Sequence, residues 1–373
     1  DRTLDWFHTL KNVVNAGVAE RASQQDHDYD TAHAAERWIY DYARGPDKRP
    51  FMLKVSFTHP HDPYVTPPEY WDRYRHDDID MPVTPFIPPE ERDAHGQWLY
   101  SHYDRGEYEV ADKDIRKSRH GYYGSIALVD DLIGRVLDAL KAARLDDNTI
   151  IVFTADHGDM LGERGNWYKM SFYEQACRVP LMISMPGQSG SRRVSQCTSL
   201  MDLMPTLLDM TLDGGTDHLV EPIDGRSLMP LVAGDASGWA DETASEIFFE
   251  GARAPGMLIR RGTRKYVHWE GGPCSLFDLA TDPHEHHNLV ADPAYAEEVT
   301  AFEAEVRRRW PLEELTERIL LKQRRNALVF KALMSGEVTP LDFQPHDDAS
   351  KRYYRGYGNW HEAEARDFLR FDT

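Results

Sequence analysis

The sequence contains little cysteine: three residues among 373, namely Cys177, Cys197 and Cys274. A sparse, odd set argues against a framework of disulfide bonds and favours a reducing compartment, so we expect the protein in the cytoplasm. Long apolar runs are also missing, since none approaches the about 20 residues of a membrane-spanning helix. These absences exclude a disulfide-rich secreted domain and predict no association with a membrane.

Positive charge is scarce as well. Lys and Arg number 43 against 63 Asp and Glu, which gives a formal net charge of −20. Such an acidic chain repels phosphate backbones, so nucleic acid is not an expected partner, whereas a small cationic substrate would be attracted. No secretory signal peptide is visible. Because the first residue is Asp1 and not Met, we expect that an N-terminal segment is missing from this sequence.

The sequence does contain enough apolar residues for a large core. Hydrophobic residues make up 41% of the 373, which suits one large α/β domain with an appendage. Apolar residues at helical spacing predict helices over residues 31–44, 122–144, 202–210, 294–310 and 312–334. Asp202 is expected to cap the third of these helices. Short apolar runs predict strands over residues 51–57, 150–153 and 179–187.

A helix followed by a continuous apolar strand is typical of α/β proteins with parallel, central strands. We therefore expect an α/β fold on a large, mixed or mostly parallel sheet flanked by helices. Residues 60–115 lack a sustained period and predict a long excursion over the surface. After about Ala240, short strands between Gly and Pro predict a small antiparallel sheet, followed by a turn-rich link over 276–289. The expected parts are residues 1–240, 241–310 and 311–373.

Polar side chains follow two of the predicted strands. His61 and Asp62 come after the strand 51–57, and Asp156 and His157 come after the strand 150–153. In an open parallel sheet, ligands bind beyond the carboxyl ends of the strands. If the two strands are parallel neighbours, both groups lie at the same edge of the sheet, which predicts a site there.

Asp156 and His157 are candidate metal ligands. A carboxylate oxygen beside an imidazole nitrogen suits a divalent cation, and Gly158 allows the backbone to turn so that both side chains reach one ion. Two ligands do not complete a site, so the others must come from elsewhere. The competing interpretation is that Asp156 caps the next segment and His157 packs in the core. Their position at the end of a buried strand favours the metal.

His61 and Lys169 are candidate catalytic residues. Prolines on both sides, in PHDP, hold the backbone around His61 and suit a rigidly placed acid or anion-binding donor. The alternative is a loop histidine without a role. A lone lysine is usually a solvated surface charge, but Lys169 has aromatic neighbours that would desolvate it beside an anion. These neighbours are Trp167, Tyr168, Phe172 and Tyr173.

Several segments resemble those of a known enzyme family. The stretch TADHGDMLGERGNWYKMSFYEQACRVPLMISMPG, from Thr154 to Gly187, resembles the second conserved region of the sulfatases, in the alkaline phosphatase superfamily. SFTHPHDPY resembles their histidine-containing loop, and DLMPTLLDM and DGRSLMPL also fit. RWPLEELTERILLKQRRNALVFKALMSGEVTPLDFQPHDDASKRYYRG resembles the C-terminal extension of choline sulfatases. The likeness runs from about residue 25 to about residue 357.

The resemblance implies a sulfatase α/β core over residues 1–240, an α+β subdomain over 241–310 and the extension with its tail over 311–373. It also implies hydrolysis of a sulfate monoester with a bound divalent cation. By position, Asp156 and His157 would bind the cation, with calcium expected and manganese as the alternative. Lys169 and His61 would hold the sulfate, and His61 is placed to protonate the leaving alcohol.

The nucleophile of the family does not match any residue of this sequence. Sulfatases attack with formylglycine, which is made from the Cys of a Cys-x-Pro/Ala-x-Arg motif, and Cys177, Cys197 and Cys274 each lack that context. Asp130 and Asp131 lie in a predicted helix and do not match the early Asp–Asp metal pair of the family. We therefore expect the nucleophile and part of the metal site on the missing N-terminal segment.

The choline-sulfatase likeness implies a small cationic substrate, choline-O-sulfate. A quaternary ammonium donates no hydrogen bond, so aromatic faces and a carboxylate must hold it. Glu246 and Glu250 are the candidate carboxylates, although each is also a plausible strand or turn acid. Trp360, with Tyr353 and Tyr357, is a candidate aromatic wall, and the terminal arm would supply it across the interface of a homo-oligomer.

Two alternatives stay open at this point. One is a phosphonate or phosphate ester hydrolase, acting on monoesters or diesters, since such enzymes of the same superfamily share the metal-binding residues. The other is a non-catalytic protein that binds a cation and serves as an assembly partner, because the nucleophile is absent from this chain. Hydrolysis of choline sulfate, compared with a phenyl phosphonate ester, separates the first alternative from the main hypothesis.

Overall fold

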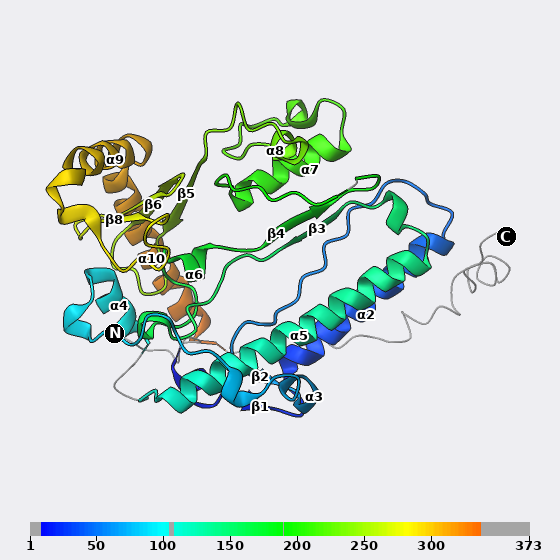
Figure 1. The fold of residues 1–373 in the computed structure, drawn as a ribbon, viewed down its shortest axis with the longest axis horizontal. Coiled ribbons are helices and arrows are strands. Elements are labelled where there is room, and N and C mark those ends of the chain that lie inside the picture. The colour runs from blue at the N-terminus through cyan, green and yellow to red at the C-terminus, as the bar shows by residue number, and fades with distance from the viewer. Residues whose placement is uncertain (1–8, 104–107, 189, 337–373) are drawn as a thin grey trace.

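The computed structural model describes residues 9–103, 108–188 and 190–336 (Figure 1). The α-helices are α1 Lys11–Val14, α2 Ser23–Arg44, α3 Pro68–Trp71, α4 Ala94–His102, α5 Asp112–Ala142, α6 Glu174–Cys177, α7 Leu203–Thr211, α8 Met229–Ala233, α9 Ala296–Arg309 and α10 Leu312–Leu333. The strands are β1 Gly17–Val18, β2 Val65–Thr66, β3 Ile151–Thr154, β4 Leu181–Ser184, β5 Glu242–Ile247, β6 Gly256–Arg261, β7 Arg264–Trp269 and β8 Ser275–Asp278. Across these ranges, no helix combines the length and the apolar character that crossing a bilayer requires.

The two longest predicted helices of the N-terminal part both begin earlier than the apolar pattern indicates. The side chain of Gln25 accepts a hydrogen bond from the backbone N–H of Ala22 at 2.8 Å, so α2 begins at Ser23. The carboxylate of Asp114 accepts one from Ala111 at 3.1 Å at the start of α5. These side-chain caps satisfy N–H groups at the start of each helix, which extends both helices into polar sequence.

Helices α2 and α5 run side by side along one side of the molecule (Figure 1). Ile39 and Leu128 are fully buried in the apolar clusters that join them. Glu36 and Arg135 form an ion pair at 2.7 Å across the helix pair. The helix pair therefore forms a rigid support for the chain segment that follows α2.

Residues 51–57 are extended, but they do not form a strand of a sheet. Phe51, Leu53 and Val55 pack against the helix pair, while the alternate residues face outward and Met52 is 76% exposed. Buried and exposed residues therefore alternate as in a strand, but no neighbouring strand in the described part of the chain forms backbone hydrogen bonds with this segment. The prediction of a strand is wrong in that the segment belongs to no sheet. A sheet requires a partner strand, and the periodicity of one segment does not reveal its partner.

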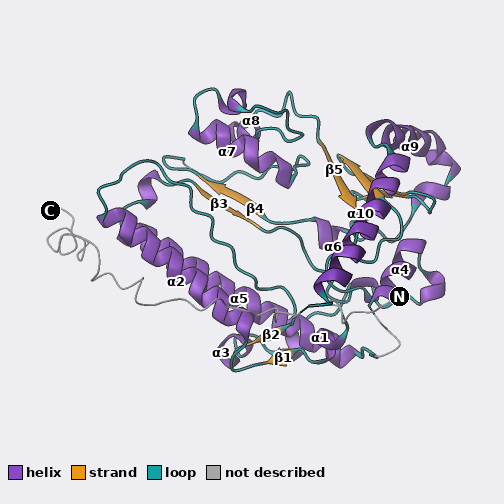
Figure 2. Cartoon of the chain, turned by 180° about the vertical axis from the view of Figure 1, so that it is seen from behind, coloured by secondary structure: helices purple, strands orange, loops and turns teal. Residues whose placement is uncertain are grey.

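Strands β3 and β4 confirm the predicted strands 150–153 and 179–187, but they pair with each other in antiparallel register, Ile151 opposite Ser184 and Thr154 opposite Leu181. The expectation of parallel, central pairing is wrong for this pair. Figure 2 shows the strands in three separate sheets, of which only the two-residue pair of β1 and β2 is parallel. Residues 51–57 and β3 are thus not parallel neighbours in the structure.

The small C-terminal sheet is confirmed, with strands in the order β5-β6-β7-β8 and antiparallel throughout. Met257, Ile259 and Tyr266 are fully buried on the face that α9 covers through Phe302 and Val306. Strand β8 lies in the stretch that was predicted to be a turn-rich link. Its four residues, Ser275–Asp278, are too few to establish a sequence period.

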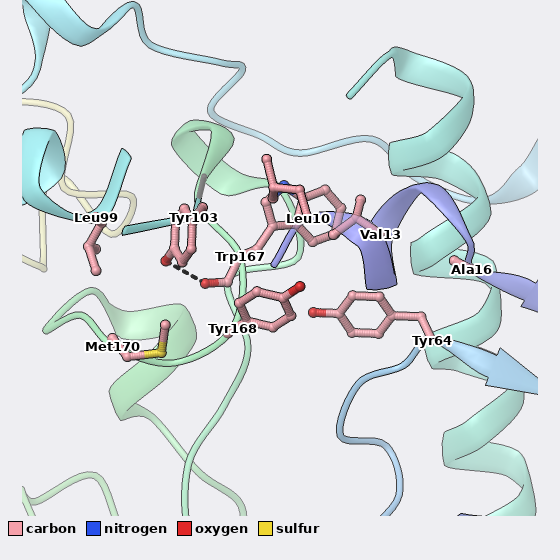
Figure 3. Packing of buried hydrophobic residues seen from close by; sticks show 9 residues of the cluster. All are labelled: Leu10, Val13, Ala16, Tyr64, Leu99, Tyr103, Trp167, Tyr168 and Met170. Carbon is pink, nitrogen blue, oxygen red and sulfur yellow. Dashed lines mark hydrogen bonds between the residues drawn. The ribbon is translucent and has the colours of Figure 1, made fainter. Parts of the chain in front are cut away.

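Residues 60–115 are not a surface excursion along their whole length. Helix α4 begins at Asp93, whose carboxylate accepts a hydrogen bond from Gly96 at 2.6 Å. Leu99 and Tyr103 from this stretch are fully buried with Trp167 and Tyr168 in one cluster (Figure 3). The prediction failed because α4 has only nine residues and a weak apolar face, so its burial depends on distant partners.

Helix α7 forms where predicted, but Asp202 does not cap it with its side chain. The carboxylate instead accepts hydrogen bonds from the backbone of Ser199 and of Arg226, each at 2.8 Å. Asp202 thus connects the segment around Arg226 to the start of the helix by a hydrogen bond. Pro205 lies in the first turn, as expected from its missing N–H group.

Candidate functional site

The candidate site begins with the loop that follows residue 57. Asp28 of α2, which is fully buried, accepts hydrogen bonds from the backbone of Thr58 at 2.7 Å and of His59 at 2.9 Å, and it contacts the His59 ring at 2.7 Å. Burial alone would raise the pKa of Asp28, but these hydrogen bonds outweigh it and hold the pKa below its usual value. The loop is therefore fixed to the helix immediately before His61.

His61 is oriented by its own neighbours. Gln24 donates a hydrogen bond to the carbonyl oxygen of His61 at 2.9 Å. The Nδ1 atom of His61 lies 2.9 Å from the carbonyl oxygen of Asp62 and 3.1 Å from its carboxylate. Asp62 is buried and accepts a further hydrogen bond from Asn12. These contacts hold the ring so that Nε2 faces away from the loop.

Lys169 meets His61 although 108 positions separate them. Its Nζ lies 3.0 Å from Nε2 of His61. An ammonium group can only donate, so Nε2 accepts and the ring proton sits on Nδ1, where the carbonyl of Asp62 accepts it. A cation and an imidazole thus converge on one point, with the His61 side chain 34% exposed and within reach of a ligand.

The backbone before Lys169 explains its position. Tyr168 adopts a left-handed conformation, with φ at +63°, and its N–H donates to the buried carboxylate of Asp159 at 3.2 Å. The rings of Trp167 and Tyr168 consequently both enter the core (Figure 3), where Tyr103 donates to the carbonyl of Trp167 at 2.7 Å. The two aromatic residues anchor the segment from beneath, and Lys169 itself is only partly buried.

Asp159 links the two chain segments that carry the candidate site. Its carboxylate accepts hydrogen bonds from the hydroxyl of Tyr64 and the backbone of Leu161, each at 2.9 Å. Burial raises the pKa of Asp159 to about 6, and these hydrogen bonds oppose that rise. Because Tyr64 follows His61 in the chain and Asp159 follows His157, this contact joins the two segments that carry the candidate site.

Asp156 and His157 lie next to this pair. The rings of His61 and His157 are 6.1 Å apart between centroids. Nδ1 of His157 contacts the carbonyl of Gly158 at 2.8 Å, which leaves Nε2 with its lone pair available, 3.7 Å from the carboxylate of Asp156. Burial lowers the pKa of His157 and favours the neutral ring that a metal requires. Asp156 is 88% exposed.

These two side chains fit a divalent cation in their chemistry but do not enclose one. Within residues 9–103, 108–188 and 190–336, no three His, Cys, Asp or Glu side chains gather closely enough to hold a metal ion. The part of the chain that is described thus offers two candidate ligands and no complete metal site.

Gly158 is required for a reason other than the one expected. Its backbone is not in the left-handed region. A Cβ atom at this position would lie 1.9 Å from the carbonyl oxygen of Gln175, and the N–H of Gly158 donates to Ala176 at 2.8 Å. The glycine therefore permits a close approach between the end of β3 and helix α6, which sets the direction of the Asp156–His157 segment.

The candidate choline-binding residues lie on other elements. Glu246 is exposed on β5 and accepts a hydrogen bond from the indole N–H of Trp310, which ties it to the C-terminal subdomain. Glu250 follows β5 in a left-handed conformation, and its neighbour Gly251 packs against Leu99 of α4. The hydrogen bond of Glu246 is thus made to Trp310 and not to His61, Lys169, Asp156 or His157. Trp360, Tyr353 and Tyr357 lie outside the described residues.

Sequence reasoning missed the residues that support the site. Asp62 could have been found, because it lies beside His61 between the same two prolines. Asn12 and Asp28 carried no such signal, since a polar residue in a helix or loop is usually solvated. Only the fold brings these two side chains beneath the loop.

Comparison with known proteins places this arrangement in a family. Residues 1–213 match the sulfatase family, residues 162–310 match the C-terminal region of N-sulphoglucosamine sulphohydrolase, and residues 317–371 match the C-terminal region of choline sulfatase. The chain is 38% identical over 361 residues to a choline-sulfatase of Rhizobium meliloti, covering 95% of this chain and 70% of that protein. It is 32% identical to an arylsulfatase of Clostridium perfringens, covering 80% of this chain and 63% of that one.

A similar fold is found among solved structures. A phosphonate monoester hydrolase from Silicibacter pomeroyi superposes with a TM-score of 0.63 at 28% identity, over 75% of this chain and 59% of that one. The α/β class predicted from the sequence is therefore confirmed, and the chain spans about three fifths to seven tenths of the length of these relatives. With the family matches and the paired His61 and Lys169, the chain belongs to the sulfatase family of sulfuric ester hydrolases, in the alkaline phosphatase superfamily, and resembles its choline sulfatases.

Proposed function

We propose that this chain carries the anion-binding part of a sulfate monoesterase, with choline-O-sulfate as the substrate. The observation that carries the proposal is the 3.0 Å contact between Lys169 and His61, which brings a cation and an imidazole to one point. The name of the 38%-identical relative and the match of the C-terminal extension support choline sulfate as the substrate.

The chemistry that this pair performs follows from the charge of the substrate. The oxygens of a sulfate ester repel a nucleophile, so the reaction needs positive charge where negative charge develops. Lys169 donates from Nζ to a sulfate oxygen. Once the sulfate oxygen takes over the ammonium of Lys169, Nε2 of His61 is released from that contact and takes up a proton from solvent. The imidazolium then gives this proton to the bridging oxygen as the alcohol leaves. The adjacent carboxylate of Asp62 stabilises the imidazolium through Nδ1, 3.1 Å away.

Two further components belong to the proposal. We propose that a divalent cation, calcium or manganese, binds with Asp156 and His157 among its ligands, and that the nucleophile is a formylglycine supplied from outside these 373 residues. The basis for the second statement is that none of the three cysteines lies in the Cys-x-Pro/Ala-x-Arg context. A cytoplasmic location and a homo-oligomer remain part of the proposal and rest on the sequence alone.

The competing function is hydrolysis of a phosphonate or phosphate ester, which the structural similarity to a phosphonate monoester hydrolase supports. The complete gene product that includes these residues should be assayed with choline sulfate and with a phenyl phosphonate ester. We expect the higher kcat/KM with choline sulfate. A clear preference for the phosphonate ester would reject the proposed substrate.

The role of Glu246 can be tested with the same protein. Glu246→Gln should raise KM for choline sulfate about tenfold, which corresponds to about 1.4 kcal/mol, because the amide no longer attracts the quaternary ammonium. An uncharged aryl sulfate should be unaffected. Glu221→Gln, at an exposed loop carboxylate, is the matched control. Equal losses with both substrates would show that Glu246 acts through the structure and not through choline.

A further inference from the structure

A second group of reactive side chains lies in the C-terminal sheet, on elements that the proposed function does not use. Strands β7 and β8 pair in antiparallel register, with Val267 opposite Ser275. The next positions outward are His268 and Cys274, which place their side chains on the same face of the hairpin because opposed residues of an antiparallel pair share a face.

The distances within this group describe a chain of three polar residues. The Sγ atom of Cys274 lies 3.5 Å from Nδ1 of His268, and Nε2 of the same ring lies 3.3 Å from the carboxylate of Glu270. His268 is 3% exposed, so its ring is fixed by packing. An acid that orients an imidazole, which in turn contacts a thiol, is the arrangement that activates a nucleophile.

The surroundings of the sulfur provide an independent observation. Tyr266, two residues before His268 on the same face, is fully buried, and its hydroxyl makes no well-formed hydrogen bond among the described residues. After burial, the thiol of Cys274 is the group that most raises the pKa of Tyr266, which places the hydroxyl beside the sulfur. A buried hydroxyl without an acceptor is suited to donate to a thiolate.

The charges around the group favour the ionised pair. Burial alone would raise the pKa of Cys274, but His268 and Tyr266 outweigh it and lower the pKa of the thiol below its ordinary value. Contact with Cys274 raises the pKa of His268. Of the charged groups on α9 that face the sulfur, Glu303 opposes the thiolate, and Arg307 contacts Glu303 at 3.2 Å and Glu270 at 4.0 Å.

The other two cysteines differ from Cys274 in this respect. Burial raises the pKa of Cys177 to about 11, and burial also raises the pKa of Cys197, which is only 7% exposed. Cys274 is partly exposed at the edge of the sheet, immediately before β8, and Cys177 is partly exposed as well. The two differ in that Cys274 contacts an imidazole at 3.5 Å. The chain therefore contains one thiol with a lowered pKa and two thiols with raised pKa values, which serve as internal references.

We propose that Cys274, with His268 and Glu270, forms a reactive thiolate site that small disulfides modify. When the thiol ionises, its proton passes to Nδ1 of His268, 3.5 Å away. The thiolate attacks one sulfur of the disulfide, the S–S bond of the reagent breaks, and a mixed disulfide forms on Cys274. The other half of the reagent leaves as a thiolate and takes up a proton. This site is separate from sulfate ester hydrolysis and does not depend on the proposed function.

The test measures the alkylation rate of each cysteine by iodoacetamide between about pH 5.5 and 9, with quantification of the modified peptides by mass spectrometry. In the native protein, the pH at which the alkylation rate of Cys274 is half-maximal should be lower than for the same cysteine in the urea-unfolded chain. Cys177 and Cys197 should stay nearly unreactive. With oxidised glutathione at neutral pH, the mixed disulfide should form on Cys274. If the half-maximal rate of Cys274 occurs at the same pH in the native and the unfolded protein, the proposal is overturned.

Two variants separate activation from exposure. His268→Gln should slow the reaction of Cys274 about tenfold at pH 6.5, which corresponds to a change of about one unit in the thiol pKa, and Glu270→Gln should slow it less. Circular dichroism tests whether each variant is folded. If His268→Gln does not fold, the pH dependence of the alkylation rate of Cys274 in the wild-type protein decides the question alone. An unchanged rate in folded His268→Gln would show that Cys274 is merely exposed.

Discussion

At the scale of single residues, Asp28 has the greatest structural influence on the candidate site. It is fully buried on α2, and its carboxylate contacts two backbone N–H groups and the His59 ring within 2.9 Å. Hydrogen bonds to a charged, buried group are stronger than those between neutral groups. The position of His61 therefore depends on an acid that belongs to another element.

Asp28→Asn should lower the free energy of unfolding by about 3 kcal/mol at pH 7, because an amide cannot accept all of these hydrogen bonds. The pKa of Asp28 is lowered in the folded state, so its stabilisation is present above the unfolded pKa, about 3.9, and is lost as pH falls through the folded pKa. The difference between wild type and variant in urea denaturation should thus shrink below about pH 4.

The control for this prediction is Asp30→Asn, at an exposed position two residues away on the same helix. It should change the free energy of unfolding by less than about 0.5 kcal/mol. If the two variants are equally stable at pH 7, the carboxylate of Asp28 does not hold the loop.

Site residues could be predicted from the sequence where they directly follow an apolar run. His61 and Asp156–His157 follow apolar runs, and the structure brings them together with Lys169. The roles assigned to them stay predictions. Asn12 and Asp28 could not be predicted, because their function depends on burial beneath a loop that is distant in sequence.

At the scale of elements, the junction of β3 and α6 depends on the absence of a side chain at Gly158. Gly158→Ala should destabilise the protein by about 1–3 kcal/mol, since the added Cβ would overlap the carbonyl oxygen of Gln175 and force the backbone to move. The same displacement should shift the Asp156–His157 segment. Thermal or chemical denaturation measures the first effect.

A matched substitution in α5 should have the opposite sign. A Cβ at Gly134 meets no atom within 4 Å, so Gly134→Ala should stabilise the protein by about 0.5–1 kcal/mol through the higher helix propensity of alanine. If Gly158→Ala were also neutral or stabilising, the close approach of β3 to α6 would be wrong.

Elements could be predicted where the sequence carries a sustained period or a continuous apolar run, and not where it carries neither. Helices α5, α9 and α10 follow a sustained period, whereas α4 and β8 have nine and four residues. The partner of a strand is a further unknown. The apolar runs of β3 and β4 did not indicate that these strands pair in antiparallel register, because periodicity reports only which face is buried.

At the scale of the whole molecule, a buried ion network joins the sulfatase core to the C-terminal sheet. Lys265 of β7 is fully buried and contacts Glu174 of α6 at 2.9 Å and Glu285 at 2.8 Å. Burial alone would lower the pKa of Lys265, but the two carboxylates raise it above its usual value. Glu285 also accepts a hydrogen bond from the backbone of Glu174 at 2.9 Å, at the start of α6.

Lys265→Met should therefore lower the free energy of unfolding by about 3–5 kcal/mol, because it removes the cation that pairs with the buried Glu285 and leaves Glu174 with Arg260 alone. Arg264→Met is the control, since Arg264 is a partly exposed neighbour that pairs with Asp278, and it should cost about 1 kcal/mol or less. Equal losses in urea denaturation would show that the network does not join the two parts of the molecule.

The account depends most on one claim: His61 and Lys169, which the fold brings within 3.0 Å, act on the same sulfate group. A double-mutant cycle with His61→Ala and Lys169→Ala, measured as kcat/KM for choline sulfate in the complete gene product, tests it directly. Each single variant should lose about 2–4 kcal/mol of transition-state stabilisation, and the double variant should lose much less than the sum. Fully additive losses, or normal turnover in Lys169→Ala, would contradict the claim.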